Sequence, residues 1–106
     1  MRTLVYKVKD QRIIRSGDHG GLVAGTKGYL IAKFDFDENW DDCVKVASFF
    51  TNDQKEQSCL LDKNDTCKIP EDVLKHNVFK LRVEGRREGY RILTDRAIEQ
   101  QSGGEN

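Results

Sequence analysis

Hydrophobic and polar residues alternate along several short segments of this chain, in the pattern of strands that bury one side. The clearest segment is 29–36, where every second residue is apolar, namely Leu30, Ala32, Phe34 and Phe36. An apolar side opposite a mixed side is typical of an antiparallel strand with one face in the core. Similar alternation predicts further strands over 2–8, 11–15, 43–50, 57–61, 66–69, 78–84 and 90–94.

Turn residues separate the predicted strands at intervals of about eight to twelve residues, which favours a sandwich or a barrel. Residues 2–15 predict an N-terminal hairpin, and residues 57–61 and 66–69 predict a second one. Pro70, with two acidic residues behind it, suits a single turn of helix. No segment has a helical period of useful length, so the pattern predicts an all-β domain of seven to eight short antiparallel strands.

The length of 106 residues corresponds to one domain, which we place over 1–99. Hydrophobic residues make up 37% of the chain and charged residues 34%, which is lean in apolar residues but above the range of disordered chains. Residues 100–106 are polar and predict a disordered tail. We therefore expect one modest core followed by a short flexible end.

Basic and acidic residues balance at 18 each, so the net charge is zero. Proteins that coat nucleic acid usually have a positive sum, so the balance argues against nucleic acid as a partner. No apolar run approaches the roughly 18 residues of a membrane span, and the N-terminus lacks the apolar core of a signal peptide. We expect the protein in the cytoplasm of the cell that makes it, unless it leaves inside an assembled particle.

The chain has an odd number of cysteines, namely Cys43, Cys59 and Cys67, and no two of them form a Cys-x-x-Cys motif. This pattern fits a reducing compartment better than a disulfide scaffold. Cys59 and Cys67 flank a predicted turn and are the pair that would face each other if any pair oxidised. A zinc site with His19 or His76 would lack the closely spaced ligand pair of structural zinc sites, so we expect no metal and no cofactor.

Five acidic residues lie around the single tryptophan, Trp40, and form a cluster that we term the acidic corner: Asp35, Asp37, Glu38, Asp41 and Asp42. Clustered carboxylates can bind calcium, but their spacing is not that of a calcium-binding loop and no glycine stands at the turn. The favoured interpretation is a solvated corner of a sandwich. Trp40 would then close the end of a core that also contains Phe34 and Phe49.

Four arginines and a tyrosine form a second cluster, which we term the basic corner: Arg82, Arg86, Arg87, Tyr90 and Arg91. Arginine pairs with phosphate in a bidentate manner and an aromatic ring can stack on a base, so one interpretation is a grip for a small nucleotide. A second is docking against the acidic corner of a neighbouring copy, which would produce a homo-oligomer. A third is an ordinary hairpin tip that its charge keeps soluble and protects from edge pairing.

Catalytic chemistry has weak support in the sequence. His19 follows Asp18 in a glycine-rich loop and could assist acid–base catalysis, but adjacent residues rarely face each other and no nucleophile stands beside them. His76 has the context of a turn residue, and the glycines from Gly20 onward lack the lysine and the helix of a phosphate-binding loop. We therefore predict that the protein is not an enzyme.

Over about residues 22–98, the chain contains an ordered series of short motifs. The order is a strand, Glu-x-Trp, a strand ending in Ala-x-Phe, a hairpin, Ile-Pro-x-x-Val-Leu and a final Tyr-Arg-Ile-x-Thr. The residues that carry this order are Gly28, Phe34, Glu38, Trp40, Lys45, Ala47, Phe49, Ile69, Pro70, Val73, Leu74, Tyr90, Arg91, Ile92 and Thr94. The order resembles small immunoglobulin-like domains of phages and prophages of Gram-positive bacteria. Such domains occur near the N-terminus of baseplate and receptor-binding proteins, and also as short stand-alone proteins.

The resemblance implies an antiparallel immunoglobulin-like β-sandwich with an additional N-terminal hairpin, a segment that could swap onto a neighbour and favour an oligomer. It implies a non-enzymatic virion accessory or assembly protein, in the tail, the baseplate or the capsid decoration, that contacts other phage structural proteins. The alternative is a phage anti-defence protein that binds a host defence protein, or sequesters a signalling nucleotide at the basic corner. The expected location is the host cytoplasm and then the virion.

Overall fold

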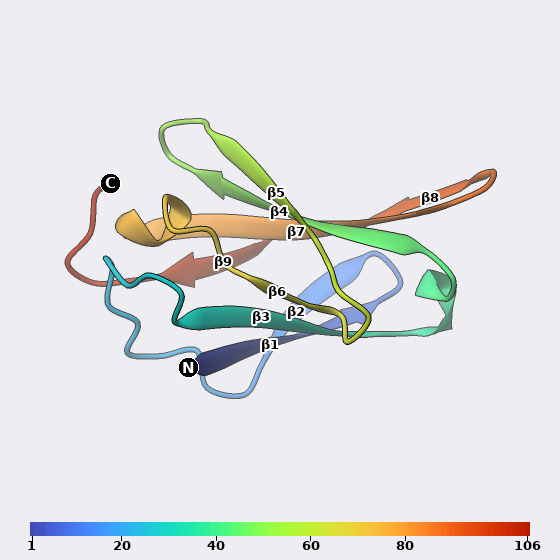
Figure 1. Cartoon of the computed structure of the whole chain (residues 1–106), viewed down its shortest axis with the longest axis horizontal. Coiled ribbons are helices and arrows are strands. Elements are labelled where there is room, and N and C mark those ends of the chain that lie inside the picture. The colour runs from blue at the N-terminus through green and yellow to red at the C-terminus, as the bar shows by residue number, and fades with distance from the viewer.

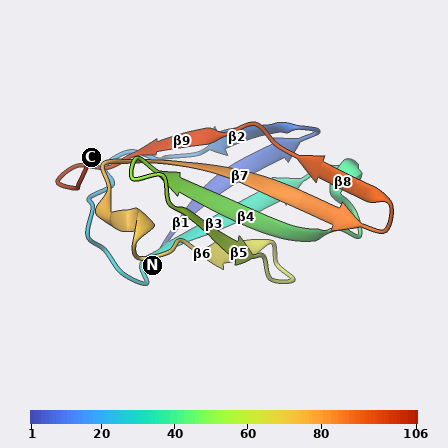
Figure 2. The ribbon, with the colours of Figure 1, turned by 90° about the horizontal axis from the view of Figure 1, so that it is seen from above.

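The computed structural model describes all 106 residues as two β-sheets packed face to face, with two short 3-10 turns and no α-helix. Figure 1 shows the two layers from the side, and Figure 2 shows the strands of one sheet running obliquely across those of the other. No helix in the structure is both long and apolar enough to span a membrane. The elements are β1 (Arg2–Lys9), β2 (Arg12–Ser16), β3 (Leu30–Phe36), η1 (Glu38–Trp40), β4 (Val44–Thr51), β5 (Glu56–Leu60), β6 (Thr66–Lys68), η2 (Val73–Lys75), β7 (Val78–Arg87), β8 (Tyr90–Leu93) and β9 (Ala97–Gln100).

The fold is the predicted all-β sandwich, with nine strands rather than seven or eight. The first sheet has the strand order β2-β1-β3-β6. β1 pairs antiparallel with β2 but parallel with β3, so one pair departs from the predicted antiparallel arrangement. The connection over 17–29 causes this, because it leads the chain back along the sheet and sets Leu30 beside Arg2. Both strands of the N-terminal hairpin thus pack within their own chain.

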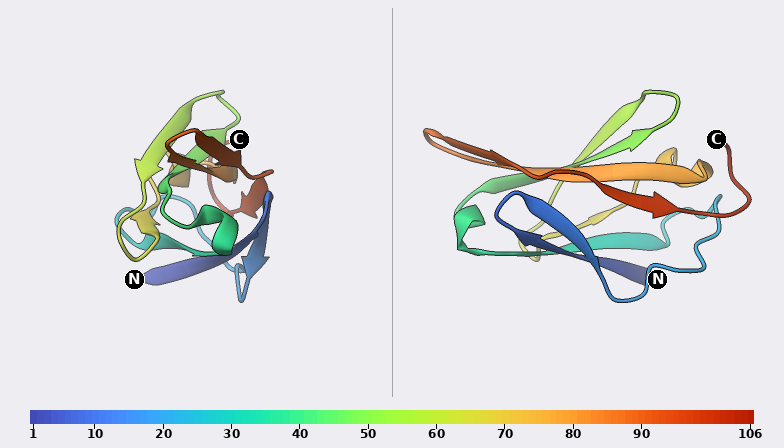
Figure 3. Two further views of the ribbon diagram at one scale, coloured as in Figure 1. Left: turned by 90° about the vertical axis from the view of Figure 1, so that its right-hand side faces the viewer. Right: turned by 180° about the vertical axis from the view of Figure 1, so that it is seen from behind.

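The second sheet has the order β5-β4-β7-β8, and β9 continues the edge beside β7. β8 pairs with residues 84–87 of β7, and β9 pairs with residues 78–81. Between these two pairings, the three residues 94–96 stand opposite only two residues of β7 and form a β-bulge. β8 and β9 are therefore two parts of one edge strand that the bulge interrupts. Figure 3 shows β8 and β9 following one another along β7.

The bulge joins the two sheets along one side of the sandwich. Asp95 accepts a hydrogen bond from the main-chain N of Ile13 at 2.9 Å, and its own main-chain N donates to Gln11 O at 2.8 Å. The side chain of Gln11 donates in turn to Leu93 O at 3.1 Å. These contacts hold the β2 edge against the β8 and β9 edge and bring the loop after β2 close to β9.

The predicted hairpin of residues 57–61 and 66–69 is wrong. β5 pairs with β4 in the second sheet, whereas β6 pairs with β3 in the first. The connection crosses between the sheets, with Leu61 buried and Asp62 accepting hydrogen bonds from both the main-chain N and the hydroxyl of Thr66. Alternation indicates which residues of a strand face the core, but it does not indicate which sheet the strand joins.

Twenty buried apolar residues form the core between the sheets. The three side chains expected there, Phe34, Phe49 and Trp40, are at most 2% exposed. Trp40 belongs to η1, and its Nε1 donates to Asp10 O at 2.9 Å. A Cβ on Gly85 would lie 2.7 Å from the indole ring, so only glycine at this position of β7 leaves room for Trp40 to close the end of the sandwich.

The C-terminal residues lie against the body of the protein, contrary to the disordered tail predicted over 100–106. Gln101 is 7% exposed, and its side-chain nitrogen donates to Leu74 O at 3.2 Å and to His76 O at 2.8 Å. Main-chain hydrogen bonds continue along the tail as far as Glu105. The polar composition was misleading because Gln101 needs its polar side chain to reach the carbonyl groups at the end of η2.

Candidate functional site

The five residues of the basic corner do not form one site, because successive residues of a strand face opposite sides. Arg82 and Arg86 point away from the core on the outer face of the second sheet, where Arg86 pairs in register with Arg91. Arg87 pairs in register with Tyr90, and both side chains contact the region of η1. The basic corner therefore consists of two groups on opposite sides of the β7–β8 hairpin.

On the outer side, Glu84 holds two of the arginines. Arg86 Nε and Arg91 Nε each donate to the Glu84 carboxylate at 2.7 Å. Partial burial raises the pKa of Glu84, but the hydrogen bonds from the two arginines outweigh this effect, and the pKa lies below its ordinary value. The two guanidinium groups thus share one carboxylate and are fixed over the sheet.

On the inner side, Arg87 and Tyr90 fasten the hairpin tip to the acidic corner. The Arg87 guanidinium lies 4.1 Å from the centroid of the Tyr90 ring, and its Nη1 donates to Asp41 O at 3.0 Å. The Tyr90 hydroxyl donates to Asn39 O at 2.7 Å. One face of the ring and the hydroxyl are therefore already in use, so this geometry does not favour Tyr90 as a platform for a nucleotide base.

The acidic corner adjoins the basic corner in the same molecule. Asp37 caps η1, where its carboxylate accepts from the main-chain N of Asn39 at 3.0 Å and of Asp10 at 2.6 Å. The other four side chains are exposed: Asp35, Glu38, Asp41 and Asp42. No group of three or more His, Cys, Asp or Glu side chains in the structure could hold a metal ion.

The outer face of the second sheet combines arginines with apolar side chains, and we term it the arginine face. Phe50 lies toward one end of this face, where β4 pairs with Glu56 and Lys80. The Arg82 guanidinium is 5.4 Å and the Arg96 guanidinium 4.0 Å from the centroid of its ring. Val44 and Leu60 are 62% and 67% exposed. The strand register sets these residues on one face together with Val46, Ser48, Ser58, Lys80, Glu84, Arg86, Arg91, Leu93 and Ile98.

The arginine face carries an excess of positive charge although the whole chain is neutral. Two carboxylates, Glu56 and Glu84, stand on this face against five cations, which are Lys80, Arg82, Arg86, Arg91 and Arg96. Arginine and aromatic residues are enriched in protein interfaces, and exposed Val and Leu side chains there lose contact with water on binding. The face therefore has the composition of a protein-binding surface that would suit an acidic partner.

Three cysteines are free in the structure, including Cys59 on β5 and Cys67 on β6, the pair singled out from the sequence. The two side chains lie close together, since Cys59 Sγ is 3.8 Å from Lys68 O, next to Cys67. Burial, and then the neighbouring Cys59, raises the pKa of the Cys67 thiol to about 12. Cys67 is thus a neutral thiol at ordinary pH and a poor nucleophile.

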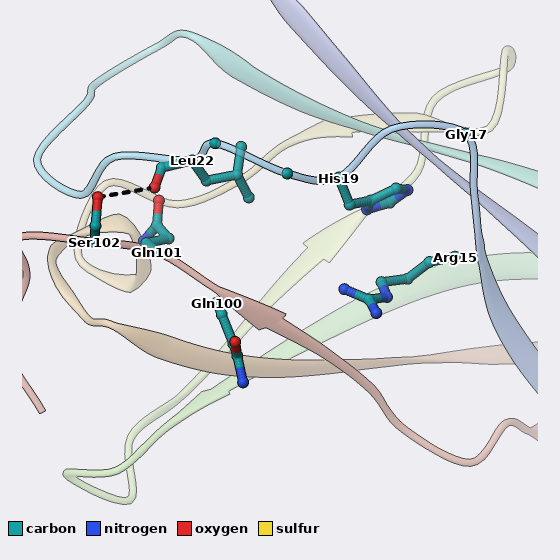
Figure 4. A pocket seen from close by; sticks show the side chains of 9 residues that line it. Arg15, Gly17, His19, Leu22, Gln100, Gln101 and Ser102 are labelled. Carbon is teal, nitrogen blue, oxygen red and sulfur yellow. Dashed lines mark hydrogen bonds between the residues drawn. The ribbon is translucent and has the colours of Figure 1, made fainter.

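A second candidate site, which the sequence did not reveal, is a polar cleft of about 650 Å³ between the loop after β2 and β9 (Figure 4). We term it the loop cleft. Leu22 is the one apolar residue that lines it. Its other lining residues are Arg15, Gly17, His19, Gly20, Gly21, Gln100, Gln101 and Ser102.

A buried charged cluster stands behind the loop cleft. Glu99 is fully buried. Its Oε2 accepts a hydrogen bond from the Tyr6 hydroxyl at 2.6 Å and also lies 2.6 Å from His19 Nδ1. Burial, and then the charge of Glu99, raises the pKa of Tyr6 above its ordinary value, so the phenol stays protonated. Arg15 Nη1 lies 3.6 Å from the other carboxylate oxygen, Glu99 Oε1, which has no hydrogen-bond partner.

His19 therefore pairs with Glu99 and not with its neighbour Asp18. Its Nε2 lies 3.0 Å from Val5 O and 2.9 Å from Ser16 O, so both ring nitrogens contribute to holding the loop. His76 is 7% exposed at the end of η2, with its Nε2 3.7 Å from Asp53. One signal that the sequence analysis did not use is the position of Glu99, which alternates with Ala97 on the inward side of β9.

No protein-family model matches this chain, and no curated protein matches it significantly.

Proposed function

We propose that this protein is a non-enzymatic binding module of a phage or prophage particle that contacts another structural protein through the arginine face. The observation that carries the proposal is the combination, on one sheet face, of exposed Val44 and Leu60 with an arginine-flanked Phe50. The phage context comes from the resemblance of the ordered motifs over residues 22–98 to small phage and prophage domains.

Apolar burial, preorganised arginines and excess charge would each favour binding at the arginine face. Burial of exposed apolar side chains contributes about 25 cal/mol for each Å² removed from water. Arginines already held over the sheet by Glu84 and Phe50 lose little side-chain entropy on binding, because their geometry is fixed beforehand. Their excess positive charge selects an acidic surface and accelerates the encounter with it. We therefore propose an acidic surface of a neighbouring particle protein as the partner.

The test is recovery of partners from cells infected with the phage that encodes the protein, followed by mass spectrometry. The tagged wild type is compared with a double variant of the arginine face, Arg82→Glu with Arg96→Glu. The matched control is Lys7→Glu with Lys33→Glu, which reverses two exposed charges on the outer face of the first sheet. Recovery of particle proteins by the wild type and the control, but not by the Arg82/Arg96 variant, is the expected result.

Two results would contradict the proposal. Equal recovery of particle proteins by the Arg82/Arg96 variant would remove the arginine face from the interaction. Recovery of a host defence protein from uninfected cells, with no particle protein from infected ones, would favour the anti-defence role. Sedimentation of the purified protein at low and high salt distinguishes a second copy as the partner, because docking of the acidic corner onto the arginine face would weaken with salt.

A further inference from the structure

The loop cleft is separate from the arginine face and presents a different chemistry. It lies at the side of the sandwich where the loop after β2 passes β9, and its lining is polar except for Leu22. Figure 4 shows Arg15 and His19 on one side of the cleft, with Gln101 and Ser102 on the other. The cleft thus joins segments from opposite ends of the chain.

Arg15 brings a set of unused hydrogen-bond donors to the cleft. Its side chain is 51% exposed, and its closest charged partner, Glu99 Oε1, is 3.6 Å away, beyond hydrogen-bond distance. A guanidinium has five N–H donors in a planar fork that matches the oxygens of a carboxylate or a phosphate. Gly17 and Gly21 also line the cleft, and their main-chain N–H groups donate no hydrogen bond within the protein.

The charge behind the cleft can be counted from the geometry. Carbonyl oxygens face His19 Nε2, so this nitrogen carries a proton. A second proton must lie between His19 Nδ1 and Glu99 Oε2, because two lone pairs would otherwise meet at 2.6 Å. Wherever that proton resides, His19 and Glu99 together have no net charge. Tyr6 is neutral, so Arg15 contributes one positive charge that its neighbours do not cancel.

We propose that the loop cleft binds a small oxyanion, the carboxylate or phosphate group of a small polar molecule, with Arg15 as the residue that pairs with it. An uncancelled guanidinium with free donors, next to unpaired main-chain N–H groups, is complementary to oxygen acceptors that carry a negative charge. Because Leu22 is the one apolar residue of the lining, the molecule that carries the group is polar. A cleft of about 650 Å³ has room for more than the oxyanion alone.

Glu99 acts here as a positioning residue. Its Oε2 is held by Tyr6 and His19, while its Oε1 lies close enough to attract the Arg15 guanidinium without forming a hydrogen bond to it. The contact with Glu99 Oε1 therefore keeps Arg15 at the cleft and leaves its donors free. A ligand oxyanion then competes with no existing hydrogen bond of the guanidinium.

The experiment is a titration of the 15N-labelled full chain with inorganic phosphate and, separately, with acetate, at constant ionic strength. We expect saturable shifts confined to residues 15–22 and 99–102. Arg15→Gln should weaken the binding at least tenfold, whereas Arg12→Gln, which removes an exposed arginine from the same strand, should leave it unchanged. The Arg82/Arg96 variant should also bind normally, which separates this site from the proposed docking function.

The comparison of the two probes identifies the ligand class. Saturation at a lower concentration of phosphate indicates a phosphate ligand, and saturation at a lower concentration of acetate indicates a carboxylate ligand. Shifts that stay linear up to tens of millimolar for both anions would overturn the proposal. So would equal binding by Arg15→Gln, provided that its spectrum away from the cleft matches that of the wild type. Arg15→Lys gives a further check, because it retains the charge and loses the fork, and we expect binding between that of the wild type and Arg15→Gln.

Discussion

The arginine face and the loop cleft present arginines in two different ways. On the arginine face, the arginines lie on an open sheet, and Glu84 and Phe50 hold them in place from the side. In the loop cleft, a single arginine stands in front of a buried carboxylate that is itself held by Tyr6 and His19. The first arrangement suits a large partner surface, and the second suits one small group.

The two regions should also differ in whether substitutions affect partner binding or the stability of the fold. The arginines of the arginine face lie at the surface, so their replacement should alter partner binding and change the free energy of unfolding little. The cluster behind the loop cleft bridges the two sheets, because Tyr6 lies on β1, Glu99 on β9 and His19 in the loop between β2 and β3. Replacement there should destabilise the whole sandwich.

The largest expected effect comes from Glu99→Ala. Removing the buried carboxylate leaves the Tyr6 hydroxyl and His19 Nδ1 without their shared partner, which should cost about 3–5 kcal/mol of unfolding free energy. Urea unfolding followed by tryptophan fluorescence measures the loss. Glu99→Gln is the matched control and should lose less, because its amide oxygen still accepts from Tyr6. A loss below about 1 kcal/mol for Glu99→Ala would show that the cluster does not hold the sheets together.

A much smaller effect on stability is expected on the arginine face. The double variant Arg82→Glu with Arg96→Glu should unfold within about 0.5 kcal/mol of the wild type, because both side chains lie on the surface above Phe50. The same urea titration tests this expectation. A loss of 2 kcal/mol or more, on the order of a core substitution, would mean that the arginines serve the fold, and the binding tests with this variant would lose their meaning.

A second small effect concerns the pH dependence of stability. The pKa of Glu84 is lowered in the folded state, so its contribution is present above the unfolded value of about 4.3 and is lost as the pH falls through the folded value. Glu84→Gln should therefore be less stable than the wild type at pH 7, by at most about 1 kcal/mol. The difference should shrink toward zero as the pH falls through the folded pKa. A difference that grows on acidification would contradict the ion pairs with Arg86 and Arg91.

The strands and their inward faces were predictable from the sequence because alternation is local. Leu30, Ala32 and Phe34 are buried as their spacing indicates, and Trp40 closes the core. Partnership between strands was not predictable in the same way. β5 and β6 look like a hairpin in the sequence, yet they join different sheets, because pairing depends on contacts far apart in the chain.

The same limit applies to the candidate sites. Arg82 and Arg86 are an even number of positions apart on one strand, so alternation sets them on one face, and it sets Arg87 on the other. The sequence interpretation grouped them by charge and overlooked this parity. The loop cleft could not be predicted from local pattern, because His19 and Glu99 are 80 positions apart and the polar tail that positions Gln101 resembles a disordered end.

The most direct test of the central claim, that the arginine face is the docking surface, is photo-crosslinking in cells that assemble the particle. A photoreactive amino acid replaces Leu60, which is 67% exposed on the arginine face, or Ile14, which is 46% exposed on the outer face of the first sheet. The account predicts a crosslink to one particle protein from position 60 and none from position 14. A crosslink from position 14 alone, or equal crosslinks from both positions, would contradict it.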